Sequence, residues 1–158
     1  MQATPAPDIP EGFAPLPVGG DFMRVNGPLY LRHDVRHESD TVLVGFRVEK
    51  RHTNPMGICH GGMLATMADM LLPVCIHRLT PEVAGRFLPT ISLQIDYLAP
   101  SPLGAWVQGQ GQVLRATRSM VFAQGLISAD GIPVVRVSGI FKIGVLFAAL
   151  KSKPTKTA

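Results

Sequence analysis

The chain has 158 residues, 46% of them hydrophobic and 16% charged, with a formal net charge of +4. This length suits one domain with a sizeable core and is short for two. Lys and Arg are scattered with few aromatic residues between them, unlike a nucleic-acid-binding surface, so the positive balance suits an anionic small molecule better. The apolar share is slightly high, and we expect part of the surface to meet another subunit.

Residues 1–17 are rich in proline and lack the basic and apolar regions of a signal peptide. We interpret them as a flexible lead-in to a single domain at 18–147, followed by a flexible basic tail at 148–158. The most apolar late stretch is shorter than the roughly 18 to 20 residues of a bilayer span, so neither a transmembrane helix nor a membrane partner is expected. The two cysteines, Cys59 and Cys75, lack the spacing of a metal site or a disulfide framework, which favours a reducing, cytoplasmic location and no bound metal.

Taken in chain order, the first predicted elements are two extended segments at 28–35 and 41–50, which could form a hairpin. After a turn-forming segment, Met, Leu and Ala favour one helix over 62–72. This helix is apolar almost all round, so a sheet should wrap most of it. Pro73 should kink or end it, because proline has no N–H for the carbonyl of Asp69.

The rest of the chain predicts an antiparallel meander of four strands. These strands are expected at 90–98, 105–114, 120–128 and 133–143. Asp130-Gly131 marks a hairpin turn between the last two. In the first of them, alternation places Thr90 on a polar face, opposite Ile91 and Tyr97. One long helix and a curved antiparallel sheet of five to six strands make an α+β domain.

Asp69 is a lone carboxylate in the most apolar helix of the chain. Burying a charge among Met, Leu and Ala side chains is costly unless the charge has a partner or a function. An arginine partner or a capping role would explain it structurally, and catalysis would explain it functionally. Asp69 is therefore the first candidate for a catalytic residue.

The residues around this carboxylate resemble a known signature. The pattern is Asn54-x-x-Gly57-x-x-His60-Gly61-Gly62, followed by Asp69. It is similar to the active-site motif of hotdog-fold acyl-CoA thioesterases of the phenylacetate-pathway (PaaI-like) group. The resemblance implies a central helix wrapped by the sheet, hydrolysis of a small or medium acyl or aryl-acetyl CoA thioester without a cofactor, and a homodimer that is often paired into a tetramer.

The chemistry of thioester hydrolysis explains why these residue types would be useful. Attack on the carbonyl develops negative charge on oxygen, and a helix N-terminus offers free N–H groups and a partial positive charge to meet it. By the resemblance, the Gly61 N–H polarises the carbonyl, and Asp69 is either the general base or a nucleophile that forms an anhydride. Gly62, which has no Cβ, would let the thioester approach the backbone closely.

Four further positions carry over by the same resemblance. Asn54 would orient a proton-transfer partner, His60 would fix the helix start or the thioester, Gly57 belongs to the substrate-binding loop, and Thr90 would hold the attacking water. Each has a plainer structural interpretation. Asn54 before proline is a common turn starter, the glycine pair could be only a tight turn, and Thr90 could be an ordinary strand residue.

The spacing of the two principal residues predicts the assembly. Asp69 follows Gly61 by eight residues, which along an ideal helix is a rise of ~12 Å, too far for both to meet one reacting centre. We therefore predict that each site takes Gly61 from one subunit and Asp69 from another, through antiparallel helices of a two-fold dimer.

The phosphates of coenzyme A should meet basic side chains. Arg115 and Arg118 flank a predicted turn between two late strands and are the best candidates for that contact. They could instead be exposed arginines that keep strand ends soluble. Two other functions also stay open: a hydratase or dehydratase on the same fold, and a non-catalytic acyl-CoA-binding module.

Overall fold

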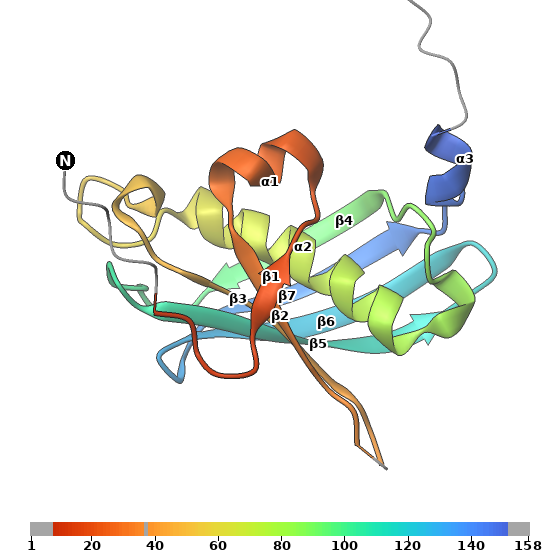
Figure 1. The fold of residues 1–158 in the computed structure, drawn as a ribbon, viewed down its shortest axis with the longest axis horizontal. Coiled ribbons are helices and arrows are strands. Elements are labelled where there is room, and N and C mark those ends of the chain that lie inside the picture. Colours follow the sequence, from red (N-terminus) through yellow and green to blue (C-terminus); the bar gives the residue numbers. More distant parts are fainter. Residues whose placement is uncertain (1–7, 37, 152–158) are drawn as a thin grey trace, which may run out of the picture.

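The computed structural model describes residues 8–36 and 38–151, which form one antiparallel sheet of seven strands packed against a long helix, α2 (Gly61–Leu79) (Figure 1). Two short helices, α1 (Gly20–Asn26) and α3 (Phe147–Lys151), lie outside this pair of layers. The strands, in sheet order, are β1 (Ala14–Leu16), β2 (Leu29–Asp34), β3 (Thr41–Arg47), β5 (Trp106–Ala116), β6 (Met120–Ala129), β7 (Ile132–Lys142) and β4 (Thr90–Tyr97).

The strand count and one pairing differ from the sequence-based expectation. The seven strands exceed the predicted five to six because β1 adds three residues at the edge beside β2. The expected hairpin of β2 and β3 is confirmed, but the meander covers only β5, β6 and β7. β4 pairs with β7 at the opposite edge, because the chain after β4 crosses past the 54–60 loop, where the Cys59 N–H donates to the Ser101 carbonyl at 2.8 Å.

The helix α2 continues through Pro73 to Leu79, so the predicted end near residue 72 is wrong. Val74, Cys75 and Ile76 are buried on the far side of the proline, and their burial in the core offsets the missing hydrogen bond. α2 is long and apolar enough to span a bilayer by length and composition, but 50% of its most apolar window is buried, as in a core helix.

Glycines let the helix approach the sheet closely. A Cβ at Gly109 would lie 2.5 Å from Leu71 Cδ2, and one at Gly111 would lie 2.8 Å from the Cys75 sulfur. Such distances are far inside van der Waals contact, so a side chain at either position would force the neighbouring side chains or the helix to shift. The contacts also show that β5 runs alongside α2 in the same direction.

A β-bulge at the start of β4 changes which way its side chains point. Thr90 pairs with Phe141 and Ser92 pairs with Ile140, so Ile91 is an extra residue on one strand. Ile91 is accordingly 55% exposed. The predicted alternation fails at this point, because the bulge turns Thr90 toward α2, the same side on which Leu93 packs against the core.

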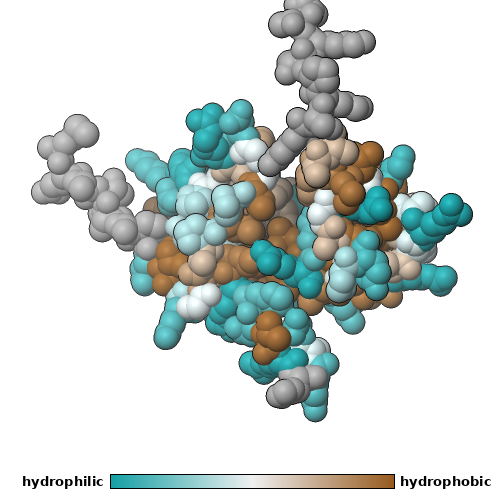
Figure 2. Space-filling view, turned by 45° about the vertical axis from the view of Figure 1, so that its right-hand side comes forward, coloured by the Kyte–Doolittle hydropathy of each residue, from teal (hydrophilic) through white to brown (hydrophobic). Residues whose placement is uncertain are grey.

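The predicted turn at Asp130-Gly131 is confirmed, with φ of 46° and 84° at its two residues, as a two-residue hairpin of primed type requires. Residues 1–7 and 152–158 of the two end segments lie outside the described residues, and the limits of the single domain stay a prediction. Apolar side chains reach the surface in several places (Figure 2). They include Phe87, Val145, Leu146, Phe147 and Leu150 near the C-terminal end of the described chain.

Candidate active site

The N-terminus of α2 presents one free amide. His60 is the N-cap, and its Nδ1 accepts a hydrogen bond from the Gly62 N–H at 2.8 Å. The His60 carbonyl accepts from the Met63 N–H at 2.9 Å and from the Leu64 N–H at 3.2 Å. Within the described chain the Gly61 N–H has no acceptor. It is therefore available to a ligand at the positive end of the helix.

Tyr97, at the end of β4, also contacts this helix start. Its hydroxyl donates to the Gly61 carbonyl at 2.9 Å, and a Cβ at Gly61 would lie 3.5 Å from its ring. Sequence reasoning placed Tyr97 on a strand face but did not assign it to the site. A tyrosine that ends an apolar strand face needs a partner for its hydroxyl, and that is the signal that could have drawn attention to it.

Asp69 and Thr90, both predicted from the sequence, lie together. The Thr90 hydroxyl donates to Asp69 Oδ1 at 2.7 Å. Asp69 is only half-buried in the single chain, so it is less deep than its apolar neighbours suggested. Its second oxygen, Oδ2, has no hydrogen-bond partner among the residues described, which leaves it free to take a proton or to attack.

Asp69 belongs to a stripe of incompletely buried residues that follows one side of α2 at helical spacing. The stripe consists of Gly62, Thr66, Asp69, Pro73 and His77. The opposite side of α2 packs into the sheet. This stripe is the part of the helix that a second subunit could cover.

Asn54 organises the loop that leads to the helix. Its Oδ1 accepts from the Met56 N–H at 2.9 Å and from the Ile58 N–H at 3.4 Å, and its carbonyl accepts from the Gly57 N–H at 2.9 Å. Gly57 has a φ of 74°, which favours glycine there. No acceptor for the Asn54 Nδ2 lies within the described ranges. These loop contacts match the structural interpretation of Asn54 as a turn starter. Its free Nδ2 is also compatible with the predicted catalytic role.

His52 connects this loop to neighbouring segments through hydrogen bonds, although the sequence analysis did not predict a role for it. Its carbonyl accepts from the His60 N–H at 2.8 Å, its Nδ1 accepts from the Glu49 N–H at 3.0 Å, and its Nε2 lies 3.0 Å from the Asn26 carbonyl. Burial, together with the nearby charge of Arg51, lowers the pKa of His52. A hydrogen bond from Arg51 lowers the pKa of Glu49.

The two cysteines are buried and unpaired in the described part of the chain. Burial raises the pKa of Cys59 to about 11 and that of Cys75 to about 12. Thiols with such values are almost entirely protonated at neutral pH. Burial and protonation make Cys59 a poor nucleophile, although it directly precedes His60.

Arg115 and Arg118 flank the turn between β5 and β6, as predicted, and both are exposed. Neither side chain has an ion-pair or hydrogen-bond partner in the part of the chain that the structure describes. The turn lies near the end of α2, and Gly61 begins the helix at its opposite end (Figure 1). Within one protomer the structure does not bring these arginines to the Gly61 amide.

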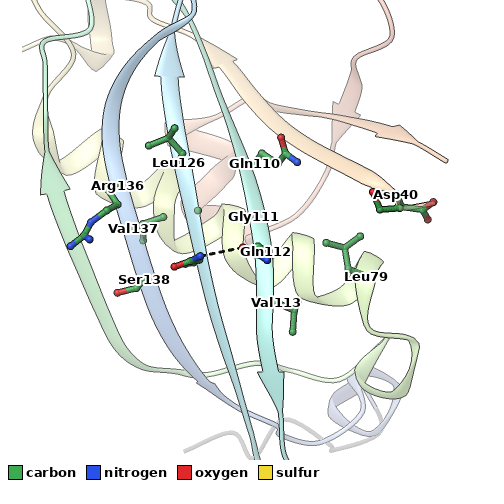
Figure 3. Close-up of a pocket in the computed structure, with 13 residues that line it drawn as sticks. Asp40, Leu79, Gln110, Gly111, Gln112, Val113, Leu126, Arg136, Val137 and Ser138 are labelled. Atoms are coloured by element: carbon green, nitrogen blue, oxygen red, sulfur yellow. Dashed lines mark hydrogen bonds between the residues drawn. The ribbon is translucent and has the colours of Figure 1, made fainter. Parts of the chain in front are cut away.

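An open hollow of about 890 Å³ lies elsewhere (Figure 3). Its lining is mixed, and its polar part comes from side chains that alternate along three strands with those facing the helix, among them Gln110, Gln112, Gln124, Arg136 and Ser138. Gln124 donates to Gln112 at 3.1 Å within it. None of the predicted site residues lines this hollow, so it is distinct from the candidate active site.

Comparison with known proteins decides the family. Residues 56–135, which include most of the motif, Asp69 and Thr90, match the family model described as the thioesterase superfamily. The chain belongs to the thioesterase superfamily. The match confirms the predicted thioesterase family, and this thioesterase is a thioester hydrolase.

Two relatives align with much of the thioesterase. A Pseudomonas aeruginosa protein named as an esterase is 28% identical over 138 residues, which cover 86% of this chain and 98% of the relative. Acyl-coenzyme A thioesterase 13 of Homo sapiens is 30% identical over 105 residues, which cover 65% of this chain and 69% of the relative.

Solved structures show the same fold. Zebra fish thioesterase superfamily member 2 is 24% identical with a TM-score of 0.65, over 80% of this thioesterase and 88% of that chain. A mutant of the phenylacetic acid degradation protein PaaI from Thermus thermophilus is 23% identical with a TM-score of 0.61, over 77% and 97%. A Streptococcus pneumoniae thioesterase protein with coenzyme A is 20% identical with a TM-score of 0.59, over 73% and 87%.

Proposed function

We propose that the thioesterase hydrolyses a small or medium acyl or aryl-acetyl CoA thioester to the free acid and coenzyme A. The observation that carries this proposal is the arrangement along α2, where a free amide at Gly61 precedes a half-buried carboxylate, Asp69, that is held by Thr90. The name of the human relative and the coenzyme A in the Streptococcus pneumoniae structure support the CoA thioester as substrate.

In this reaction the Gly61 N–H donates to the thioester oxygen, where negative charge develops, and the helix terminus adds its partial positive charge. If Asp69 is the base, its Oδ2 takes a proton from water, the hydroxide adds to the carbonyl carbon, and the C–S bond breaks to release CoA thiolate, which is then protonated. If Asp69 is the nucleophile, it forms an anhydride with loss of CoA, and water cleaves the anhydride to the acid. Thr90 holds the carboxylate in either route.

Each site draws on two subunits in this proposal. Gly61 and Asp69 lie on one continuous helix, α2, so their separation along its axis is ~12 Å within a protomer. An antiparallel α2 from a second subunit would bring its Gly61 opposite this Asp69. The incompletely buried stripe of α2 and the open edge of β4, where Tyr97 and Leu98 are each 54% exposed, are the surfaces available for that contact.

The remaining motif residues take supporting roles. Asn54 keeps Nδ2 free to orient the water or the acid near the partner's site, and His60 and Gly57 shape the loop that receives the thioester. Arg115 and Arg118 meet the phosphates of CoA in this proposal. Their replacement by Ala should raise KM more than it lowers kcat, and the reverse pattern would refute the contact.

The assembly is a homodimer, with a homotetramer as the alternative, in the cytoplasm. Size measurement by light scattering across a dilution series tests the dimer. Subunits that remain monomeric and fully active would contradict the shared site.

The function is tested by following free thiol release over a panel of acyl-CoA substrates, with wild-type protein and Asp69→Asn. We expect release with the wild type and a loss of at least about a thousandfold in kcat with Asp69→Asn, since the base or nucleophile is gone. Conversion of enoyl-CoA without thiol release would instead indicate a hydratase. Tight acyl-CoA binding without turnover, unchanged by Asp69→Asn, would indicate a binding module.

A further inference from the structure

We propose that Tyr97 is a positioning residue that aims the Gly61 amide at the thioester oxygen. This inference rests on the proposed function and adds a residue that the motif does not include. Tyr97 does not touch the reacting atoms in this proposal. It acts through the backbone of the helix start.

The peptide unit that joins Gly61 to Gly62 is held at both ends. Its carbonyl oxygen accepts from the Tyr97 hydroxyl at 2.9 Å, and its N–H donates to His60 Nδ1 at 2.8 Å. The Gly61 N–H belongs to the preceding peptide unit, whose carbonyl is held by the first turn of α2. Two adjacent peptide planes are thus fixed, and the Gly61 N–H, which belongs to the first of them, is the amide that meets the thioester oxygen in this proposal.

A helix that starts with two glycines needs such restraint. Glycine samples more backbone conformations than any other residue, and the first turn of a helix lacks half of its hydrogen bonds. An N–H donor with a variable orientation stabilises the charge of the transition state less well, because it must first be reoriented toward that charge. The Tyr97 hydroxyl removes that freedom from one side, and its ring also covers one side of Gly61 at van der Waals distance.

The same strand holds both parts of the site. β4 contacts Asp69 through Thr90 at its start and Gly61 through Tyr97 at its end. Both ends of β4 are paired with β7, Thr90 with Phe141 and Tyr97 with Val135. The spacing between amide and acid in each protomer is therefore set by a paired strand as well as by the helix.

The test is Tyr97→Phe, which removes the hydroxyl that donates to the Gly61 carbonyl and keeps the ring that lies against Gly61. We expect kcat for acyl-CoA hydrolysis to fall about tenfold, with KM and Tm nearly unchanged, because a neutral hydrogen bond contributes on that order. The matched control is Tyr30→Phe, since Tyr30 is buried beside Trp106, away from the site, and should leave kcat unchanged.

A pair of ligands separates positioning from general structural support. One is an acyl-CoA analogue with a trifluoromethyl ketone in place of the thioester, which presents an oxygen to the amide. The other is a thioether analogue with no carbonyl. Tyr97→Phe should weaken binding of the ketone by about tenfold and binding of the thioether by less than about twofold. Equal losses for both ligands, or no loss for either, would overturn the proposal.

The experiments also distinguish a failure of this inference from a failure of the proposed function on which it rests. Wild-type protein that releases no thiol from any acyl-CoA would end the proposed function. Active wild type with a Tyr97→Phe variant of equal kcat would end only the role of Tyr97. If Tyr97→Phe lowers Tm and binding of both analogues together, the residue is structural and the inference is wrong.

Discussion

Thr90 donates a hydrogen bond to Asp69 across the gap between β4 and α2, with 2.7 Å between the two oxygens. The bond depends on the bulge at Ile91, because regular alternation would have turned Thr90 to the other face of the strand. Bulges recur beside active sites because they re-aim a single side chain without breaking the sheet. Here the bulge joins a strand residue to the acid of the helix.

This bond predicts the behaviour of Thr90→Val. Valine keeps the shape and removes the donor, and a hydrogen bond to a charged group contributes about 1.5 to 3 kcal/mol. We expect kcat for thiol release to fall by about ten- to a hundredfold, with a normal circular dichroism spectrum. Ser92→Ala, just beyond the bulge, is the control and should retain wild-type kcat. A Thr90→Val variant as active as the control would show that Asp69 does not need this partner.

The two glycines at the helix start should respond differently to alanine. A Cβ at Gly61 would make only ordinary contact with the Tyr97 ring at 3.5 Å, whereas a Cβ at Gly62 would lie 3.0 Å from His60 Nδ1. Gly61→Ala should therefore keep Tm and lose activity, because the methyl group obstructs the thioester. Gly62→Ala should disturb the cap and cost about 1 kcal/mol of stability. Thermal melts with activity assays on both variants would decide, and a melt lowered only in Gly61→Ala would contradict this account.

His52 predicts a decline of stability on mild acidification. Its pKa lies below the ordinary value of 6.5, so as pH falls the unfolded chain binds this proton before the folded one does. Stability from this group is complete above about pH 6.5 and is lost progressively below it, because a protonated Nδ1 cannot accept from the Glu49 N–H. Urea denaturation at about pH 7.5 and about pH 5.5, on either side of that value, should show a smaller difference in His52→Gln than in wild type.

Identical pH dependence in His52→Gln and wild type would remove His52 as the source.

The cysteines predict resistance to thiol reagents. Because burial raises the pKa of Cys59 to about 11 and that of Cys75 to about 12, native protein should react with iodoacetamide far more slowly than free cysteine and keep its activity. Unfolding in urea should expose both thiols to rapid reaction. Rapid labelling of native protein together with loss of activity would mean that Cys59 is exposed or activated.

Local features of the sequence predicted where several residues of the candidate site lie. The glycine pair, its preceding histidine and Asp69 depend on backbone geometry over a few residues, so their spacing carried the information, and the Asp130-Gly131 turn was equally local. Strand limits were within a few residues because alternation reports burial directly.

What the sequence could not predict depends on contacts between distant segments. The residues near Ile91 do not indicate a bulge, because the extra residue is defined only by the pairing of β4 with β7. The continuation of α2 past Pro73 depends on burial of Val74 and Ile76 by the sheet. The contact between Tyr97 and the helix start became visible only when the end of β4 was placed beside Gly61.

The glycines beneath α2 bear on substrate choice. Where Gly109 and Gly111 meet Leu71 and Cys75, an added methyl group would press on the side chains of the helix, so there is no room for an acyl chain between α2 and β5 at these two positions. In the proposed dimer, selectivity for chain length should therefore reside along the boundary between subunits. Substitutions along the incompletely buried stripe of α2 and the open edge of β4, with Gly109 and Gly111 kept, are therefore the changes that we expect to alter the acyl preference.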